Sequence, residues 1–232
     1  MQSLQALQEQ LQSGALLGAS QITLPAGLQT FPQELFALAD TLEVLDLSGN
    51  QLSTLPDDLT RFGKLRVLFA SNNPFTALPR VLGRMPQLEM VGFKACQIRT
   101  VAADSLPPQL RWLILTDNQI RELPDTLGER PRLQKLMLAG NQLQSLPPGL
   151  AHSPRLELLR LAGNRFEALP PEVLAMPALA WLAIAGNPMT QHSEQQVLQA
   201  QAPHAWHSQD LQRHELLGQG ASGHIYRASP VG

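Results

Sequence analysis

Cysteine is scarce in this sequence, because Cys96 is the only one among 232 residues. No intrachain disulfide can form, whereas secreted domains are often stabilised by several disulfides. The sequence also has no uninterrupted apolar stretch near the roughly 18 residues that a membrane span needs. Its first residues lack the basic and apolar regions of a secretory signal. We therefore expect a cytoplasmic chain that has no membrane partner.

An excess of positive charge is also missing. The chain has 17 basic and 19 acidic residues, for a formal net charge of −2. Without a large basic field, nucleic acid is not an expected partner. Hydrophobic residues make up 44% of the chain and charged residues 16%, which fits one well-buried core or two small ones.

What the sequence has in abundance is an internal repeat. Leucines, an asparagine and a Leu-Pro step recur in the pattern LxxLxLxxNxLxxLP, and the asparagine position returns every 22 or 23 residues. We call these positions the asparagine ladder: Asn50, Asn73, Cys96, Asn118, Asn141, Asn164 and Asn187. An irregular unit containing Ile22, Leu24 and Leu28 precedes the ladder, and we interpret it as a capping repeat.

These units resemble the leucine-rich-repeat family over residues 16 to 190. The resemblance implies an α/β solenoid, a leucine-rich-repeat horseshoe with a parallel concave β-sheet of about eight repeats and a helical cap at each end. The 23-residue repeat with its Leu-Pro step also resembles cytoplasmic repeat proteins associated with small GTPases. A small GTPase is therefore one class of partner that the resemblance suggests.

Each repeat has a physical explanation of its own. Alternation over residues 44–48 predicts a strand with Leu45 and Leu47 pointing inward. The ladder amide satisfies backbone groups of a buried turn, and Leu-Pro starts an irregular or short-helical return on the convex side. We interpret Asp57 and Asp58 as residues of a helix start, not a catalytic pair. Because it stands in the ladder, Cys96 is predicted to be a buried structural thiol and not a nucleophile.

Four segments are expected. Residues 1–15 form an N-terminal helical cap in which Leu4, Leu7 and Leu11 share a face. Residues 16–190 form the solenoid. Residues 191–205 form a C-terminal cap helix and linker, starting at a capping box of Ser193 and Gln196, with the apolar pair at 197–198 turned inward. Residues 206–232 form the start of a different domain.

The residues that flank the inward strand leucines are expected to face the concave surface. Many of them are apolar or aromatic, and such residues are enriched at the centres of protein interfaces. The predicted partner is therefore an apolar protein face or helix. The strongest candidates for contact with it are Phe69, Met90, Trp112, Ile114, Met137, Arg160 and Trp181.

A glycine-rich motif follows the repeats. Residues 217–228 read LGQGASGHIYRA and resemble the glycine-rich loop of protein kinases, LGxGxxGxVYxA. The resemblance assigns contacts with ATP to Gly218, Gly220, Gly223 and Ile225. It departs from the family at Ser222, where an aromatic residue is usual. The alternative is a flexible linker. A Rossmann loop would need a helix after the glycines, but Ile, Tyr and then Pro predict a second strand.

Two functions remain open on these grounds. The first is the recognition domain of a cytoplasmic protein kinase, which recruits a substrate or regulator on its concave face. The chain reaches Gly232 before a catalytic lysine, HRD or DFG motif, so we expect a fragment cut just inside a kinase domain. This chain would have no catalysis and no cofactor, and the longer kinase would use ATP and Mg. The alternative is a free-standing adaptor or effector. A nucleotide-binding enzyme ranks last because no GxxxxGK[ST] motif occurs.

Overall fold

The computed structural model describes residues 5–6, 9–10, 13–200, 210–220 and 223–230. They divide into two compact units, Met1–Gln191 and His192–Gly232. Leu4, Leu7 and Leu11, on which the predicted N-terminal cap depends, lie outside the described residues. Within the described ranges, no helix is both long enough and apolar enough to cross a lipid bilayer.

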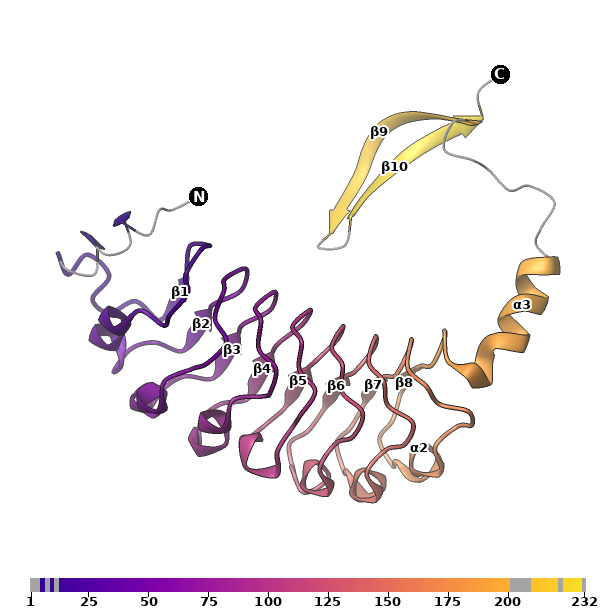
Figure 1. Cartoon of the computed structure of the whole chain (residues 1–232), viewed down its shortest axis with the longest axis horizontal. Coiled ribbons are helices and arrows are strands. Elements are labelled where there is room, and N and C mark those ends of the chain that lie inside the picture. Colours follow the sequence, from indigo (N-terminus) through magenta and orange to yellow (C-terminus); the bar gives the residue numbers. More distant parts are fainter. Residues whose placement is uncertain (1–4, 7–8, 11–12, 201–209, 221–222, 231–232) are drawn as a thin grey trace. The chain divides into compact units, whose positions relative to one another are not determined.

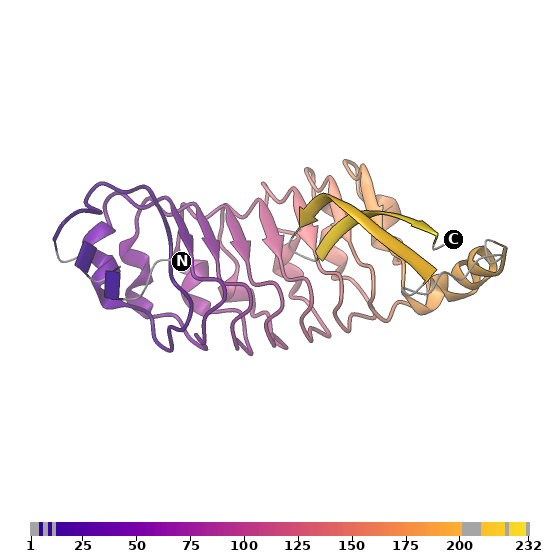
Figure 2. The ribbon, with the colours of Figure 1, turned by 90° about the horizontal axis from the view of Figure 1, so that it is seen from above.

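The first unit is a solenoid with one parallel sheet. Its eight strands pair in chain order, β1 with β2 through to β8, and lie side by side in Figures 1 and 2. The strands are β1 (Gln21–Thr23), β2 (Val44–Asp46), β3 (Val67–Phe69), β4 (Met90–Gly92), β5 (Trp112–Ile114), β6 (Lys135–Met137), β7 (Leu158–Arg160) and β8 (Trp181–Ala183). The predicted solenoid, its parallel sheet and the repeat number are therefore confirmed.

Each strand is shorter than its repeat pattern suggests. β2 ends at Asp46, two residues before the predicted end at Ser48. The backbone nevertheless continues to bond to the next repeat, since the Leu47 amide donates to the Phe69 carbonyl over 2.7 Å. The strand ends early because the chain must already turn toward the ladder asparagine.

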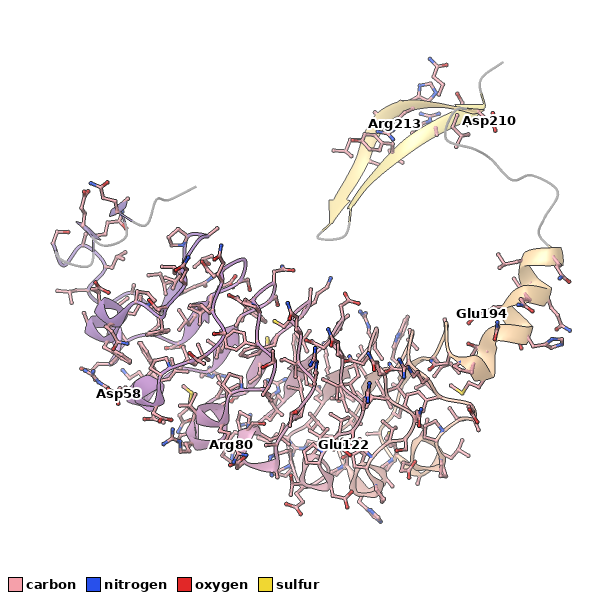
Figure 3. All side chains as sticks on the ribbon, in the orientation of Figure 1. Asp58, Arg80, Glu122, Glu194, Asp210 and Arg213 are labelled. Carbon is pink, nitrogen blue, oxygen red and sulfur yellow. The ribbon has the colours of Figure 1, made fainter. Side chains whose placement is uncertain are left out.

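The return segments are short helices on the opposite side of the solenoid, and Figure 3 labels Asp58 and Arg80 there. Most begin directly after the proline of a Leu-Pro step, whose fixed φ suits the position before a helical turn. Asp57 and Asp58 lie in the first turn of η2, as expected. The helices are η1 (Gln33–Leu38), η2 (Asp57–Arg61), η3 (Arg80–Arg84), η4 (Ala103–Ser105), η5 (Asp125–Leu127), η6 (Pro148–His152) and α2 (Pro171–Ala175), with η7 (Pro188–Thr190) after the last strand.

The asparagine ladder connects neighbouring repeats by hydrogen bonds. Asn164 is buried, and its Nδ2 donates to Leu138 of the preceding repeat over 2.9 Å while its Oδ1 accepts from the Leu143 amide over 3.0 Å. Cys96 takes the same place and donates weakly to the Ala70 carbonyl over 3.5 Å. These bonds satisfy backbone groups that stacking has removed from water, as the sequence predicts.

The residue before each ladder position has a left-handed backbone. Four of these residues are glycines, including Gly163 at φ +65°. The other three carry side chains at the same conformation: Asn72, Ala95 and Asp117. Asparagine and aspartate tolerate this region, but alanine gains nothing there to offset the contact of its Cβ with the backbone. Ala95 is therefore a point of backbone strain.

Replacing Ala95 with glycine is expected to stabilise the chain by about 1 kcal/mol, because the removed strain exceeds the added freedom of the unfolded chain. Urea unfolding of the full chain measures the change. Gly163→Ala is the matched reverse substitution, since an added Cβ there meets no atom closer than 3.5 Å and only its φ opposes it. Stabilisation by Gly163→Ala, or loss of stability in Ala95→Gly, contradicts this account.

The second unit contains a helix and a hairpin. Helix α3 (Gln191–Ala200) begins before Ser193, so the predicted capping box is wrong. The capping box joins Asn187 and Thr190 instead, at the start of η7, because the ladder asparagine already caps that turn. Val197 and Leu198 are 52% and 68% exposed. Their predicted inward packing is wrong because two consecutive residues do not make an apolar helix face.

The hairpin consists of β9 (Leu211–Gly220) and β10 (Gly223–Pro230), which pair antiparallel. A strand therefore follows the glycines, as predicted, in place of the helix that a Rossmann loop requires.

Candidate functional site

The sheet brings the predicted contact residues together in two columns that cross the strands. The first residues of the strands form the first column, and the third residues form the middle column. In the first column, β-pairing sets Met90 beside Trp112. In the middle column it sets Ile114 beside Met137, which is beside Arg160. Trp181 on β8 lies apart, because β6 and β7 separate it from Trp112. The structure therefore gathers the candidates from β3 to β7 on one surface and leaves Trp181 as an exposed outlier, 59% accessible.

Phe69 lies across the neighbouring repeat. A Cβ built on Gly92 would come within 2.5 Å of Phe69 Cδ1, so the missing side chain at 92 makes room for the ring. Gly92 is buried beneath it. Position 92 therefore faces the concave surface, as predicted, but the ring of Phe69 covers it. Phe69 and Ile114 therefore form one continuous apolar surface.

Trp112 is held in place by two polar contacts. Its indole Nε1 donates to Gln134 Oε1 over 3.3 Å. The ammonium of Lys135 lies 3.8 Å from the centre of its ring, a cation–π contact. The side chain remains half-buried. An aromatic group that is ordered before binding loses less entropy when a partner covers it.

Sequence reasoning missed a charged edge beside the first column. Its centre is Glu89, whose carboxylate lies 3.1 Å from Arg66, 3.2 Å from Arg132 and 4.0 Å from Arg111. The side chain of Glu89 is only 15% exposed, which strengthens its interactions relative to those of fully solvated pairs. One carboxylate thus holds three guanidinium groups from neighbouring repeats.

The charged edge continues through Gln134. Arg111 donates to Gln134 Oε1 over 2.9 Å, and Gln134 Nε2 donates to Glu157 over 3.0 Å. The sequence carries a signal for this edge, because the residue directly before the strand is charged or an amide in six consecutive repeats. From β2 to β7 those residues are Glu43, Arg66, Glu89, Arg111, Gln134 and Glu157.

A hollow of about 260 Å³ joins the charged edge to the apolar columns. Val67, Met90 and Trp112 form its apolar wall, and Arg66, Glu89 and Arg111 are among its polar residues. A side chain inserted here contacts both kinds of group.

Cys96 has the properties of a buried thiol and not of a nucleophile. Burial raises the pKa of the Cys96 thiol, and hydrogen bonds from the backbone of Asn73, Phe75 and Asn72 oppose the shift without cancelling it. A thiol with a raised pKa is a poor nucleophile. The described residues also contain no group of three or more His, Cys, Asp or Glu side chains arranged for a metal ion.

The glycine-rich motif lies in the hairpin of the second unit. The strands pair Gly223 with Gly220 and Ile225 with Gly218, so the second glycine ends β9 and the third begins β10. Ser222, the departure from the kinase pattern, lies outside the described residues. The two strands that the motif predicts are therefore present and paired.

Family models match two parts of the chain. Residues 108–166 and residues 41–62 match models described as leucine-rich repeats. The human PH domain leucine-rich repeat-containing protein phosphatase 1 is 32% identical over 92 residues, and its mouse counterpart is 33% identical over the same length. These matches cover 39% of this chain and only 5% of each relative, so the chain spans a small part of the curated relatives that it matches.

Two solved structures are similar to this chain. An internalin from Listeria monocytogenes superposes with a TM-score of 0.54 at 20% identity, over 67% of this chain and 51% of that one. A leucine-rich-repeat protein of Leptospira interrogans gives a TM-score of 0.49 at 22% identity, over 81% of this chain and 64% of that one. At these identities, the internalin shows a shared fold and nothing about a ligand.

Proposed function

We propose that this leucine-rich-repeat solenoid binds a protein partner on the concave face of its sheet, at a site centred on Phe69, Trp112 and Met137. Leucine-rich-repeat domains generally serve as scaffolds for protein–protein interaction. The observation that carries the specific site is Trp112, which is ordered by Gln134 and Lys135 and yet remains partly open to solvent.

The composition of the surface favours an apolar segment as the bound group. Phe69, Ile114 and Met137 follow one another across the middle column with Gly92 beneath the ring. Aromatic and methionine side chains carry much of the binding energy in protein interfaces. A sugar or a free phosphate would leave these groups exposed, whereas an apolar helix or loop buries them.

The test is a comparison of three forms of the full chain. Wild-type protein is used to capture a partner from a cytoplasmic extract, the partner is identified by mass spectrometry, and its Kd is measured by calorimetry with purified material. The triple variant Phe69→Ala, Trp112→Ala, Met137→Ala is expected to raise the Kd by about 100-fold, which corresponds to about 2.7 kcal/mol.

The matched control removes apolar groups from the opposite side. Leu169→Ala, Leu174→Ala alters two exposed leucines of the return segments and is expected to leave the Kd unchanged. Circular dichroism confirms that each variant is folded. Equal affinity of the wild type and the triple variant, or loss of binding in the control, places the interface elsewhere and overturns the proposal. A small GTPase as the captured partner would favour the adaptor function over kinase recruitment.

We also propose that the hairpin is the first strand pair of a protein-kinase domain, so that the solenoid recruits a substrate or regulator to that kinase. The supporting observation is the antiparallel pairing of β9 and β10, in which Gly220 is paired with Gly223. In a longer chain, backbone amides of these glycines and of Gly218 would lie against ATP, which supplies the transferred phosphoryl group with Mg.

The gene itself tests the kinase proposal. Sequence downstream of the codon for Gly232 is expected to encode a VAIK-type lysine, an HRD loop and a DFG motif in that order. A stop codon or an unrelated downstream sequence refutes the kinase proposal and leaves the adaptor function.

A further inference from the structure

We infer that the partner presents an acidic segment, and that the arginines of the charged edge bind its carboxylates beside the apolar columns. This inference rests on the proposed concave-face function and specifies the chemistry of the partner. It depends on a second hollow, which is lined by Arg111, Arg132, Gln134, Arg155 and Glu157.

Positive charge exceeds negative charge at this hollow. Three of its five lining residues are arginines and one is an acid. Glu157 is engaged by Gln134, and Arg132 shares Glu89 with two other arginines. Arg155 is exposed and reaches no acid among the described residues within ion-pair distance. Three arginines thus share the single carboxylate of Glu89, and among the described residues Arg155 pairs with none, so positive charge is in excess at this hollow.

The excess of positive charge is confined to this part of the surface. The chain as a whole has a net charge of −2, yet Lys135 adds positive charge beside Trp112, and Arg160 adds another beside Met137 in the middle column. An electropositive surface on an acidic chain attracts an oppositely charged segment and repels a basic one. Because Trp112 donates to Gln134, which lines the hollow, the acidic group is expected to stand near an apolar side chain.

The charged edge already shows which anion it accommodates. Glu89 brings a carboxylate to Arg66 and Arg132 at 3.1 and 3.2 Å, distances at which a guanidinium donates directly to carboxylate oxygens. Arg132 and Arg155 hold equivalent places in consecutive repeats, 23 residues apart. Side chains of aspartate or glutamate from a partner are therefore a fitting counterpart.

The experiment uses synthetic peptides and the full chain. Fluorescent peptides share a Trp-Leu-Leu core and differ only in the flanking residues, which are all Glu, all Gln, all Lys or phosphoserine. Fluorescence anisotropy is expected to give the Glu peptide a Kd about tenfold lower than that of the Gln peptide, with weaker binding of the Lys peptide. High salt is expected to reduce the difference.

Two variants show where the charge acts. Arg132→Gln, Arg155→Gln is expected to remove the preference for Glu over Gln. The control Arg99→Gln, Arg121→Gln makes the same change in net charge at two exposed arginines, which contact Gln119 and Gln142, and is expected to keep the preference. Equal affinity for the Glu and Gln peptides, including undetectable binding of both, overturns the inference. The inference is also overturned if the control variant loses the preference for Glu equally, or if the wild type prefers the phosphoserine peptide and shows no preference for Glu.

The failure of this inference is separate from failure of the proposed function. If the Gln peptide binds as well as the Glu peptide, and Trp112→Ala weakens both, the concave face remains the site and only the charge assignment is wrong. If a captured partner binds equally to wild type and to the Phe69, Trp112 and Met137 triple variant, the proposed function itself fails.

Discussion

Replacing Gly83 with alanine is expected to destabilise the chain by about 3 kcal/mol, although the residue lies in a helical turn where alanine is normally favoured. Gly83 belongs to η3, and η4 of the next repeat approaches it closely. A Cβ on Gly83 would overlap the carbonyl oxygen of Asp104 and lie 2.8 Å from its carbonyl carbon. Since backbone atoms cannot rotate away as a side chain can, the two return segments must move apart.

Urea unfolding measures this effect, with Gly63→Ala as the control. An added Cβ on Gly63 meets no atom within 4 Å, so its substitution is expected to be neutral or slightly stabilising. Because a solenoid is stabilised through contacts between adjacent repeats, amide exchange near η3 and η4 is expected to accelerate most. Equal effects at 63 and 83 would show that the close approach is not energetically important.

The second large effect is expected at Asn141. Its Nδ2 donates to the carbonyls of Leu115 and Leu138 over 2.9 and 3.0 Å, and its Oδ1 accepts from the Ile120 amide over 3.0 Å. The side chain is buried. Asn141→Ala leaves these backbone groups without partners and is expected to cost about 2 to 3 kcal/mol in unfolding free energy.

Two further variants make the Asn141 result specific. Gln144→Ala changes an exposed residue of the same repeat and is expected to have little effect on the unfolding midpoint. Asn141→Cys places at 141 the residue that the chain already uses at 96, where the thiol donates weakly to a carbonyl over 3.5 Å. Its stability is expected to fall between wild type and Asn141→Ala. An alanine variant as stable as the cysteine variant contradicts a hydrogen-bonding role.

Sequence reasoning predicted the repeated elements well, but it predicted the segment after the last repeat poorly. The parallel sheet, the buried ladder and the helical returns after proline follow from a pattern that recurs in register. The capping box at Ser193 and the inward packing of Val197 and Leu198 were wrong, because no repeat supports a prediction beyond Asn187. There the ladder asparagine started the next turn itself.

At the candidate site, the periodicity predicted which residues share the surface but not how their side chains lie. Met90, Trp112, Ile114 and Met137 were placed correctly, since strand pairing continues the register of the repeat. The burial of Gly92 under Phe69 and the convergence of arginines on Glu89 were missed, because both depend on contacts between neighbouring repeats and not on position within one.

The sequence by itself determined the solenoid, its period and the two faces of its sheet. Successive side chains of a strand point to opposite faces, and the same pattern recurs in each repeat. Only the tertiary structure decided which glycines tolerate a Cβ, how Trp112 is held and where positive charge is left unbalanced. These properties are set by distances between residues about 23 positions apart, and such distances depend on how closely the stacked repeats approach one another.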